Sequence, residues 1–305
     1  MEMTVREITA KNIVTKSDLP VCDYSLNPYV GCEHACRYCY ACFMKRFTGH
    51  TEEWGEFLDV RSWEPISRPE KYAGKEIFIG SVTDPYQPAE KAFRRTRAAL
   101  EQLAGSGAKL SIATKSDLVL RDLELIKSFP DARVSWSVNT LDEAFRADMD
   151  NAAPIERRLA AMKAFHDAGV RTTCFISPIF PGITDVKAIA ERAKDICDLI
   201  WLENLNLRGT FKPRITAYIA EKYPHLVPLY RDIYVCGRLD YWRRLDEEIR
   251  AYASSLGLEY AVNDDTMSRP FGAPPVIVNY FYHSEIKRSA NKDARRGQKE
   301  YGNIT

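Results

Sequence analysis

The sequence has no long hydrophobic run and no strong excess of charge of either sign. Its 43 basic residues are balanced by 42 acidic ones, so net charge does not direct it to nucleic acid or to a membrane. No stretch is apolar for the length of a membrane span, and the N-terminus lacks the basic and then apolar order of a secretion signal. The eight cysteines do not resemble a secreted disulfide framework. We therefore expect a cytoplasmic protein with no membrane association.

Three of the cysteines stand close together in one short segment. Cys32, Cys36 and Cys39 follow the spacing C-x3-C-x2-C, with the aromatic Tyr38 just before the last of them. Thiolates are the usual protein ligands of iron–sulfur clusters, and a full set is four. Three thiolates from one loop would hold three irons of a cubane [4Fe-4S] cluster. The fourth iron would stay open to a small molecule, as catalytic zinc sites keep one position free.

A closed zinc or cluster site is the alternative interpretation of this segment. Cys42 follows Cys39 by two residues, and His34 lies inside the motif, so either side chain would supply a fourth ligand. All these candidates crowd into eleven residues, whereas a structural zinc site normally takes its second ligand pair from a separate hairpin or helix end. The crowding favours the open cluster, with Cys42 as a small buried residue.

The cysteine motif, with its aromatic residue, resembles the signature of the radical S-adenosylmethionine (SAM) superfamily. Other segments are similar to the branch related to spore photoproduct lyase, and together the matches span roughly residues 22–205. These segments are Asn27–Cys32, Gly80–Glu90, Thr114–Ser116 and Ile179–Ile183.

Short apolar segments alternate with amphipathic helices, which predicts a parallel sheet with helices outside. We expect an α/β fold, a partial (β/α)6 TIM-like radical SAM barrel, which the resemblance also implies. Its parts are an N-terminal segment 1–22, a radical SAM core 23–209 and a C-terminal extension 210–305 with a basic tail. The expected strands are one just before Cys32, then Glu76–Ser81, Lys109–Thr114, Arg133–Val138, Arg171–Ile176 and Leu199–Glu203.

Polar residues at the carboxyl ends of these strands are the candidates for binding SAM, because active sites of such barrels lie at that end. The resemblance implies that Thr83 and Asp84 lie where the superfamily holds the methionine amino group. Lys115 would meet the SAM carboxylate and Ser137 the ribose, while Arg158 lies where relatives carry an arginine. The full set of candidates is Tyr38, Ser81, Thr83, Asp84, Lys115, Ser137 and Arg158.

Each of these assignments has a purely structural alternative. Asp84 would instead cap the helix expected near Pro88, and Lys115 would simply face solvent. Arg158 would form a salt bridge on the surface of its helix. Ser137 and Tyr38 would only contribute to packing.

The resemblance implies an enzyme in which a reduced cluster passes one electron to SAM. The resulting 5′-deoxyadenosyl radical takes a hydrogen atom from a substrate, and a reductant such as flavodoxin or ferredoxin supplies the electron. Spore photoproduct lyases return a hydrogen atom from a cysteine in or near the segment that corresponds to Ile77–Gln87. That segment contains no cysteine here, so we do not expect photoproduct repair itself.

Three functions from different classes remain open at this point. One is a radical SAM enzyme acting on nucleic acid, a reading that the basic tail Lys287–Lys299 would support through phosphate contacts. Another is a radical SAM enzyme acting on a peptide or small metabolite. The third is a non-catalytic binding module stabilised by zinc or by a cluster.

Overall fold

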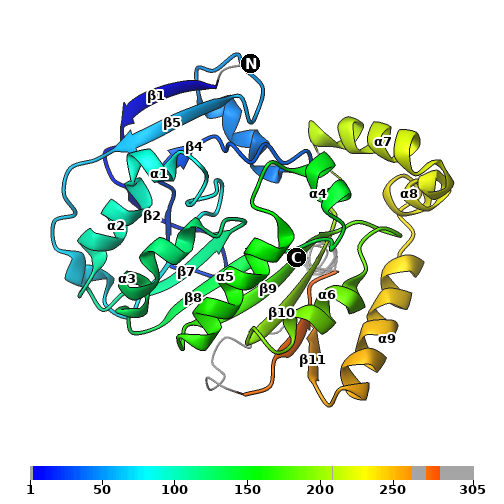
Figure 1. Ribbon diagram of the computed structural model, residues 1–305. Coiled ribbons are helices and arrows are strands. Elements are labelled where there is room, and N and C mark those ends of the chain that lie inside the picture. Colours follow the sequence, from blue (N-terminus) through cyan, green and yellow to red (C-terminus); the bar gives the residue numbers. More distant parts are fainter. Residues whose placement is uncertain (1–2, 208, 263–272, 282–305) are drawn as a thin grey trace, which may run out of the picture.

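The protein is described by a computed structural model that covers residues 3–207, 209–262 and 273–281. A nine-stranded sheet forms its centre (Figure 1). All neighbouring strands run parallel except β2, which is antiparallel to β3. In spatial order the strands are β11 (Glu259–Val262), β12 (Val276–Asn279), β10 (Leu199–Asn204), β9 (Arg171–Ile179), β8 (Ala132–Ser137), β7 (Lys109–Thr114), β6 (Glu76–Ile79), β3 (Tyr24–Leu26) and β2 (Val14–Lys16).

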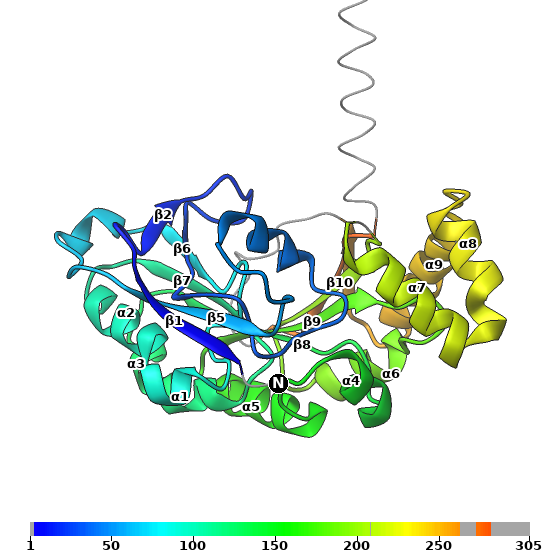
Figure 2. The same ribbon diagram turned by 90° about the horizontal axis from the view of Figure 1, so that it is seen from above.

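Helices cover one face of this sheet, as Figure 2 shows for α2, α3 and α5. The apolar alternation of the strands explains this packing, since residues such as Leu110 and Ile112 in β7 are fully buried while their neighbours are half-exposed. The α/β class and the parallel, barrel-like sheet are therefore confirmed. The helices are α1 (Glu90–Phe93), α2 (Arg95–Leu103), α3 (Leu123–Lys127), α4 (Glu143–Met149), α5 (Ile155–Asp167), α6 (Val186–Ala193), α7 (Phe211–Lys222), α8 (Val227–Tyr234) and α9 (Asp240–Ser255).

The strand expected just before Cys32 is split into two. The first of them, β3, joins the main sheet beside β6. The second, β4 (Tyr29–Val30), pairs instead with β5 (Phe57–Ser62) in a separate three-stranded sheet that also contains β1 (Thr4–Thr9). The cysteine loop therefore begins at the junction of the two sheets.

The C-terminal part of the described chain adds to the same sheet. Helices α7, α8 and α9 follow β10, and β12 then pairs with β10 in parallel. At this edge the sheet thus extends by two strands, β12 and β11, beyond the six that were expected, and β2 is a third additional strand at the opposite edge. Within the described ranges, no helix combines the length and the apolar character that crossing a membrane requires. The basic tail Lys287–Lys299 lies outside the described residues.

Candidate functional site

The three cysteines lie on the loop that follows β4. Gly31 begins the loop with φ of 94°, a left-handed conformation that favours glycine. A Cβ atom at this position would lie 2.3 Å from the carbonyl oxygen of Phe57 in β5, so only glycine allows the loop to approach that strand. A short 3-10 helix, Tyr40–Phe47, then leads the chain away from Cys39.

Hydrogen bonds from the segment after β6 hold one side of the loop. The hydroxyl of Thr83 donates to the carbonyl oxygen of Gly31 at 2.6 Å, and the backbone N–H of Glu33 donates to Oε1 of Gln87 at 2.8 Å. The amide of Gln87 also donates to Thr83 Oγ1 at 3.1 Å. Thr83, a candidate SAM contact, is therefore used to shape the loop that carries the cysteines.

The segment around the end of α4 holds the other side of the loop. The backbone N–H of Arg37 donates to the carbonyl of Met149 at 2.9 Å, and the N–H of Asn151 donates to the carbonyl of His34 at 2.8 Å. The loop is thus clamped between two segments that are far away in the sequence. Such a clamp fixes the positions of the three thiols before any ligand arrives.

The three thiols lie near one another, with Cys32 buried and Cys36 and Cys39 half-buried. Burial raises the pKa of each of them, that of Cys36 to about 12. Burial has the largest effect on the pKa of Cys32, and the charge of Asp84 raises it further. The charges of Cys36 and Cys39 also raise this pKa, so the three sulfur atoms are within electrostatic reach of one another. Burial therefore disfavours the charged form of these thiols. A metal centre would supply the positive charge that converts them to thiolates.

A buried N–H group also fits an iron–sulfur cluster at this position. The indole N–H of Trp54 has no hydrogen-bond partner among the described residues, although the residue is only 6% exposed. It lies close enough to Cys39 to lower the pKa of that thiol, against the larger, opposite effect of burial. Thiolate and sulfide of a cluster accept such hydrogen bonds, and these bonds tune the cluster potential. The residues present therefore fit a cluster held by the three thiolates.

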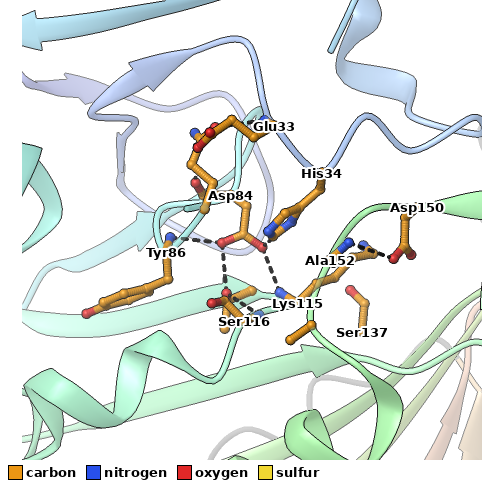
Figure 3. Close-up of polar contacts among 12 residues, drawn as sticks. Glu33, His34, Asp84, Tyr86, Lys115, Ser116, Ser137, Asp150 and Ala152 are labelled. Atoms are coloured by element: carbon orange, nitrogen blue, oxygen red, sulfur yellow. Dashed lines mark hydrogen bonds and ion pairs between the residues drawn. The ribbon is translucent and has the colours of Figure 1, made fainter. Parts of the chain in front are cut away.

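Asp84 lies at the centre of a polar network directly below the loop (Figure 3). Its carboxylate accepts hydrogen bonds from the Thr114 hydroxyl at 2.8 Å, the Lys115 N–H at 2.7 Å and the Tyr86 N–H at 2.9 Å. The ring nitrogen Nδ1 of His34 lies 3.2 Å away. Burial alone would raise the pKa of Asp84, but His34 and these donors outweigh burial and lower it. Asp84 does not cap α1, whose N-cap residue is Ala89.

Arg158 and Asp150 form a second buried network on the other side of the loop. Arg158 Nη2 lies 2.8 Å from Asp150 Oδ1, and the guanidinium also donates to the carbonyl oxygens of Ser137 and Ala153. Asp150 in turn accepts a hydrogen bond from the Tyr38 hydroxyl at 3.1 Å. The alternative of a surface salt bridge for Arg158 is wrong, because the side chain is completely buried. The pair holds the aromatic residue of the cysteine motif in place.

The remaining candidates lie at the carboxyl ends of their strands. Lys115 Nζ lies 5.8 Å from the ring centroid of Tyr38 and forms no ion pair with a described carboxylate, so its charge is available. Ser137 is 8% exposed, and its hydroxyl makes no hydrogen bond to the described part of the chain. The hydroxyl of Ser81 accepts a hydrogen bond from the Asn27 amide at 2.9 Å. Lys115 and Ser137 therefore have free polar groups near the thiols, whereas Ser81 is engaged.

The two side chains that the zinc alternative would add to the three cysteines are Cys42 and His34, and both make other contacts. Among the residues that the structure describes, no three His, Cys, Asp or Glu side chains are grouped to hold a single metal ion. Cys42 is half-buried, and its Sγ atom contacts Thr210 Oγ1 at 3.3 Å. His34 lies against Asp84, as described above.

Sequence reasoning missed three functional positions in this region. Trp54 and Asp150 lie outside every recognised motif, and only the folded chain brings them to Cys39 and Arg158. Gln87 is inside the segment Gly80–Glu90 that was recognised, but no spacing rule links it to the cysteine loop.

Known proteins match the chain over its core. The family model of the Radical SAM superfamily matches residues 26–193. The uncharacterized protein MJ0683 of Methanocaldococcus jannaschii is 32% identical over 249 residues, which cover 81% of this chain and 93% of that protein. The uncharacterized protein ORF301 of Acidianus two-tailed virus is 30% identical over 220 residues, covering 65% of this chain and 72% of that protein.

Solved structures share the fold at low sequence identity. Spore photoproduct lyase complexed with dinucleoside spore photoproduct has a TM-score of 0.51 at 16% identity, with 72% of this chain and 66% of that chain covered. SuiB of Streptococcus suis, bound to the precursor peptide SuiA, has a TM-score of 0.51 at 16% identity, with 84% of this chain and 48% of that chain covered. The fold of the chain is thus similar to that of spore photoproduct lyase, and the chain belongs to the Radical SAM superfamily as an enzyme whose reaction the family alone does not specify.

Proposed function

We propose that Cys32, Cys36 and Cys39 hold a [4Fe-4S] cluster whose fourth iron binds SAM. The observation that supports this most is the set of three neighbouring thiols on one clamped loop, with the indole N–H of Trp54 close to Cys39. Once bound, the reduced cluster and SAM would supply a 5′-deoxyadenosyl radical that abstracts a hydrogen atom from the substrate.

The chain's own residues would bind and orient SAM in this proposal. Lys115 offers an unpaired ammonium for the SAM carboxylate, and Ser137 offers a free hydroxyl for the ribose. Asp84 and Arg158 already satisfy their polar groups within the protein, so we assign them to positioning the cysteine loop and Tyr38. Burial of the site excludes water, which would otherwise react with radical species.

The substrate we favour contains a nucleobase, with a peptide as the alternative. Spore photoproduct lyase is described with a dinucleoside, and SuiB with a precursor peptide. Val82 and Thr83 stand where a hydrogen-returning cysteine would be sought, so the proposed reaction is not thymine photoproduct repair. A flavodoxin or ferredoxin would serve as the reductant.

Anaerobic reconstitution with iron and sulfide tests this function. We expect about four irons per chain and, after reduction, formation of 5′-deoxyadenosine from SAM. Stoichiometric zinc without SAM cleavage would instead identify a zinc-stabilised binding module. Adding single-stranded DNA, RNA or peptides to the assay separates the substrate classes, since a true substrate changes the rate of deoxyadenosine formation.

A further inference from the structure

Strands β9 and β10 carry a polar pair on the face of the sheet that the helices leave uncovered. Ile176 and Leu202 are fully buried in the core shared with helices α5 and α6, whereas Ser177 and Glu203 are half-exposed. Because side chains alternate along a strand, the latter two project from the opposite face. The register shifts here, with an irregularity opposite Glu203, and such irregularities often redirect side chains next to active sites.

Glu203 has no cationic partner in the described chain. Its carboxyl accepts one hydrogen bond, from the Ser177 hydroxyl at 2.9 Å, and it takes part in no ion pair among the described residues. Burial raises the pKa of Glu203, and the Ser177 hydrogen bond offsets only part of that rise. An acidic group kept in a partly buried place without a cation is unfavourable for stability, which points to a role in binding.

Aromatic side chains lie beside this pair on the same strands. Trp201, two residues before Glu203, stacks on Tyr280 with a centroid distance of 4.4 Å and an interplanar angle of 13°. Phe175, two residues before Ser177, contacts Trp201 edge-on at 6.2 Å. Both Phe175 and Trp201 are half-exposed. Flat, partly exposed rings next to a carboxyl form a surface suited to a planar ligand.

This surface lies at the same end of the sheet as the cysteine loop. Phe180, three residues after Ser177, contacts Tyr38 of the cysteine motif, with the two ring centroids 5.6 Å apart. Leu205, two residues after Glu203, packs in the same apolar cluster as Tyr38. The carboxyl ends of β9 and β10 therefore lie beside the cysteine loop.

We propose that Glu203 and Ser177, next to the rings of Phe175 and Trp201, bind an amino-substituted nitrogen heterocycle of the substrate, such as cytosine. The inference rests on the proposed function and deepens it by naming the substrate group. An ionised carboxylate accepts hydrogen bonds from an exocyclic amino group and has no donor for a carbonyl oxygen. Cytosine presents such an amino group at the ring position where uracil presents a carbonyl.

Equilibrium dialysis of the reconstituted, unreduced protein tests the assignment, with SAM at saturation. The probes are cytidine and uridine. Cytidine carries an amino group at the ring position where uridine carries a carbonyl. We expect the wild-type chain to bind cytidine about tenfold tighter than uridine. Glu203→Leu should remove this preference, and Glu203→Gln should weaken it, because the amide N–H can donate to the uridine carbonyl as well as its oxygen can accept from the cytidine amino group. Equal affinities in the wild type, or a preference that survives in Glu203→Leu, would overturn the proposal.

Two further measurements distinguish the heterocycle site from SAM binding and from the proposed radical chemistry. If Glu203→Leu weakens binding of SAM and leaves the cytidine preference intact, the carboxyl holds the adenine of SAM, and the substrate assignment is wrong. Deoxyadenosine formation by the reduced wild-type protein is measured separately. Its absence counts against the proposed function, whereas dialysis without reductant reports on the heterocycle site alone.

Discussion

The guanidinium of Arg158 lies 2.8 Å from the carboxylate of Asp150, and neither side chain is more than 1% exposed. The preceding residue, Arg157, forms an ion pair with Asp117 at the surface, where the arginine is 61% exposed. Adjacent arginines on one helix therefore make two ion pairs in opposite environments. Their comparison isolates the effect of burial.

Asp150→Asn should destabilise the protein by about 3–5 kcal/mol, because it leaves the Arg158 charge buried and uncompensated. Asp117→Asn is the matched control, with an expected loss of about 0–1 kcal/mol. Urea unfolding followed by circular dichroism measures both values. Equal losses in the two variants would show that burial does not set the strength of the pair.

The same pair predicts how stability depends on pH. Arg158 and its neighbours lower the pKa of Asp150 below its ordinary value of 3.8, despite the opposing effect of burial. An acid whose pKa is lowered by folding stabilises the folded state at pH values above its pKa in the unfolded state. This stabilisation is lost as the pH falls through the pKa in the folded state. The difference in unfolding free energy between wild type and Asp150→Asn should therefore shrink below about pH 4.

Replacing Cys32, Cys36 or Cys39 singly by alanine should abolish cluster binding, because each thiolate would hold a different iron. Cys42→Ala is the matched control, since its sulfur contacts Thr210 and should not be a ligand. Iron content and the visible absorption of the anaerobically reconstituted protein provide the measurement. Loss of the cluster in Cys42→Ala, with retention in Cys39→Ala, would reverse the ligand assignment.

Trp54→Phe should make the cluster harder to reduce. The indole N–H close to Cys39 stabilises the extra negative charge of the reduced state, and a hydrogen bond of about 0.5–1.5 kcal/mol corresponds to roughly 20–65 mV in a one-electron couple. Redox titration followed by electron paramagnetic resonance gives the potential. Trp63→Phe is the control, because the Trp63 N–H donates to Gln102. A potential unchanged by Trp54→Phe would mean that the N–H does not reach the cluster.

Glu203→Gln should stabilise the protein near neutral pH. Burial raises the pKa of Glu203, so the folded state holds the carboxyl proton more tightly than the unfolded state does. Stability is therefore lost as the pH rises through the pKa of Glu203 in the folded state. The gain should disappear near pH 4, where the carboxyl is protonated in both states. Glu191→Gln should show the opposite sign near neutral pH, since hydrogen bonds from Lys194 and Tyr252 lower the pKa of Glu191. Thermal unfolding at several pH values measures both effects.

The features of this protein that could be predicted are those encoded by residues close together in the sequence. The spacing of Cys32, Cys36 and Cys39 is contained in eight residues, so the residues that form the thiol site are visible before folding. The strands from β6 to β10 were also predicted, because each buries alternate apolar side chains within a few residues. The split of the first strand into β3 and β4 escaped prediction, since it depends on pairing with β5, which lies about 30 residues further along.

By itself, the sequence determined the grouping of the three cysteines and the class of fold, since both are encoded in local spacing and periodicity. Only the tertiary structure decided which charges are paired and which are free. It buries Arg158 against Asp150, brings the Trp54 N–H to Cys39, and leaves Lys115 and Glu203 without ion-pair partners in the described chain. Such pairings join residues from separate elements, and burial sets their strength, so no pattern along the chain reveals them.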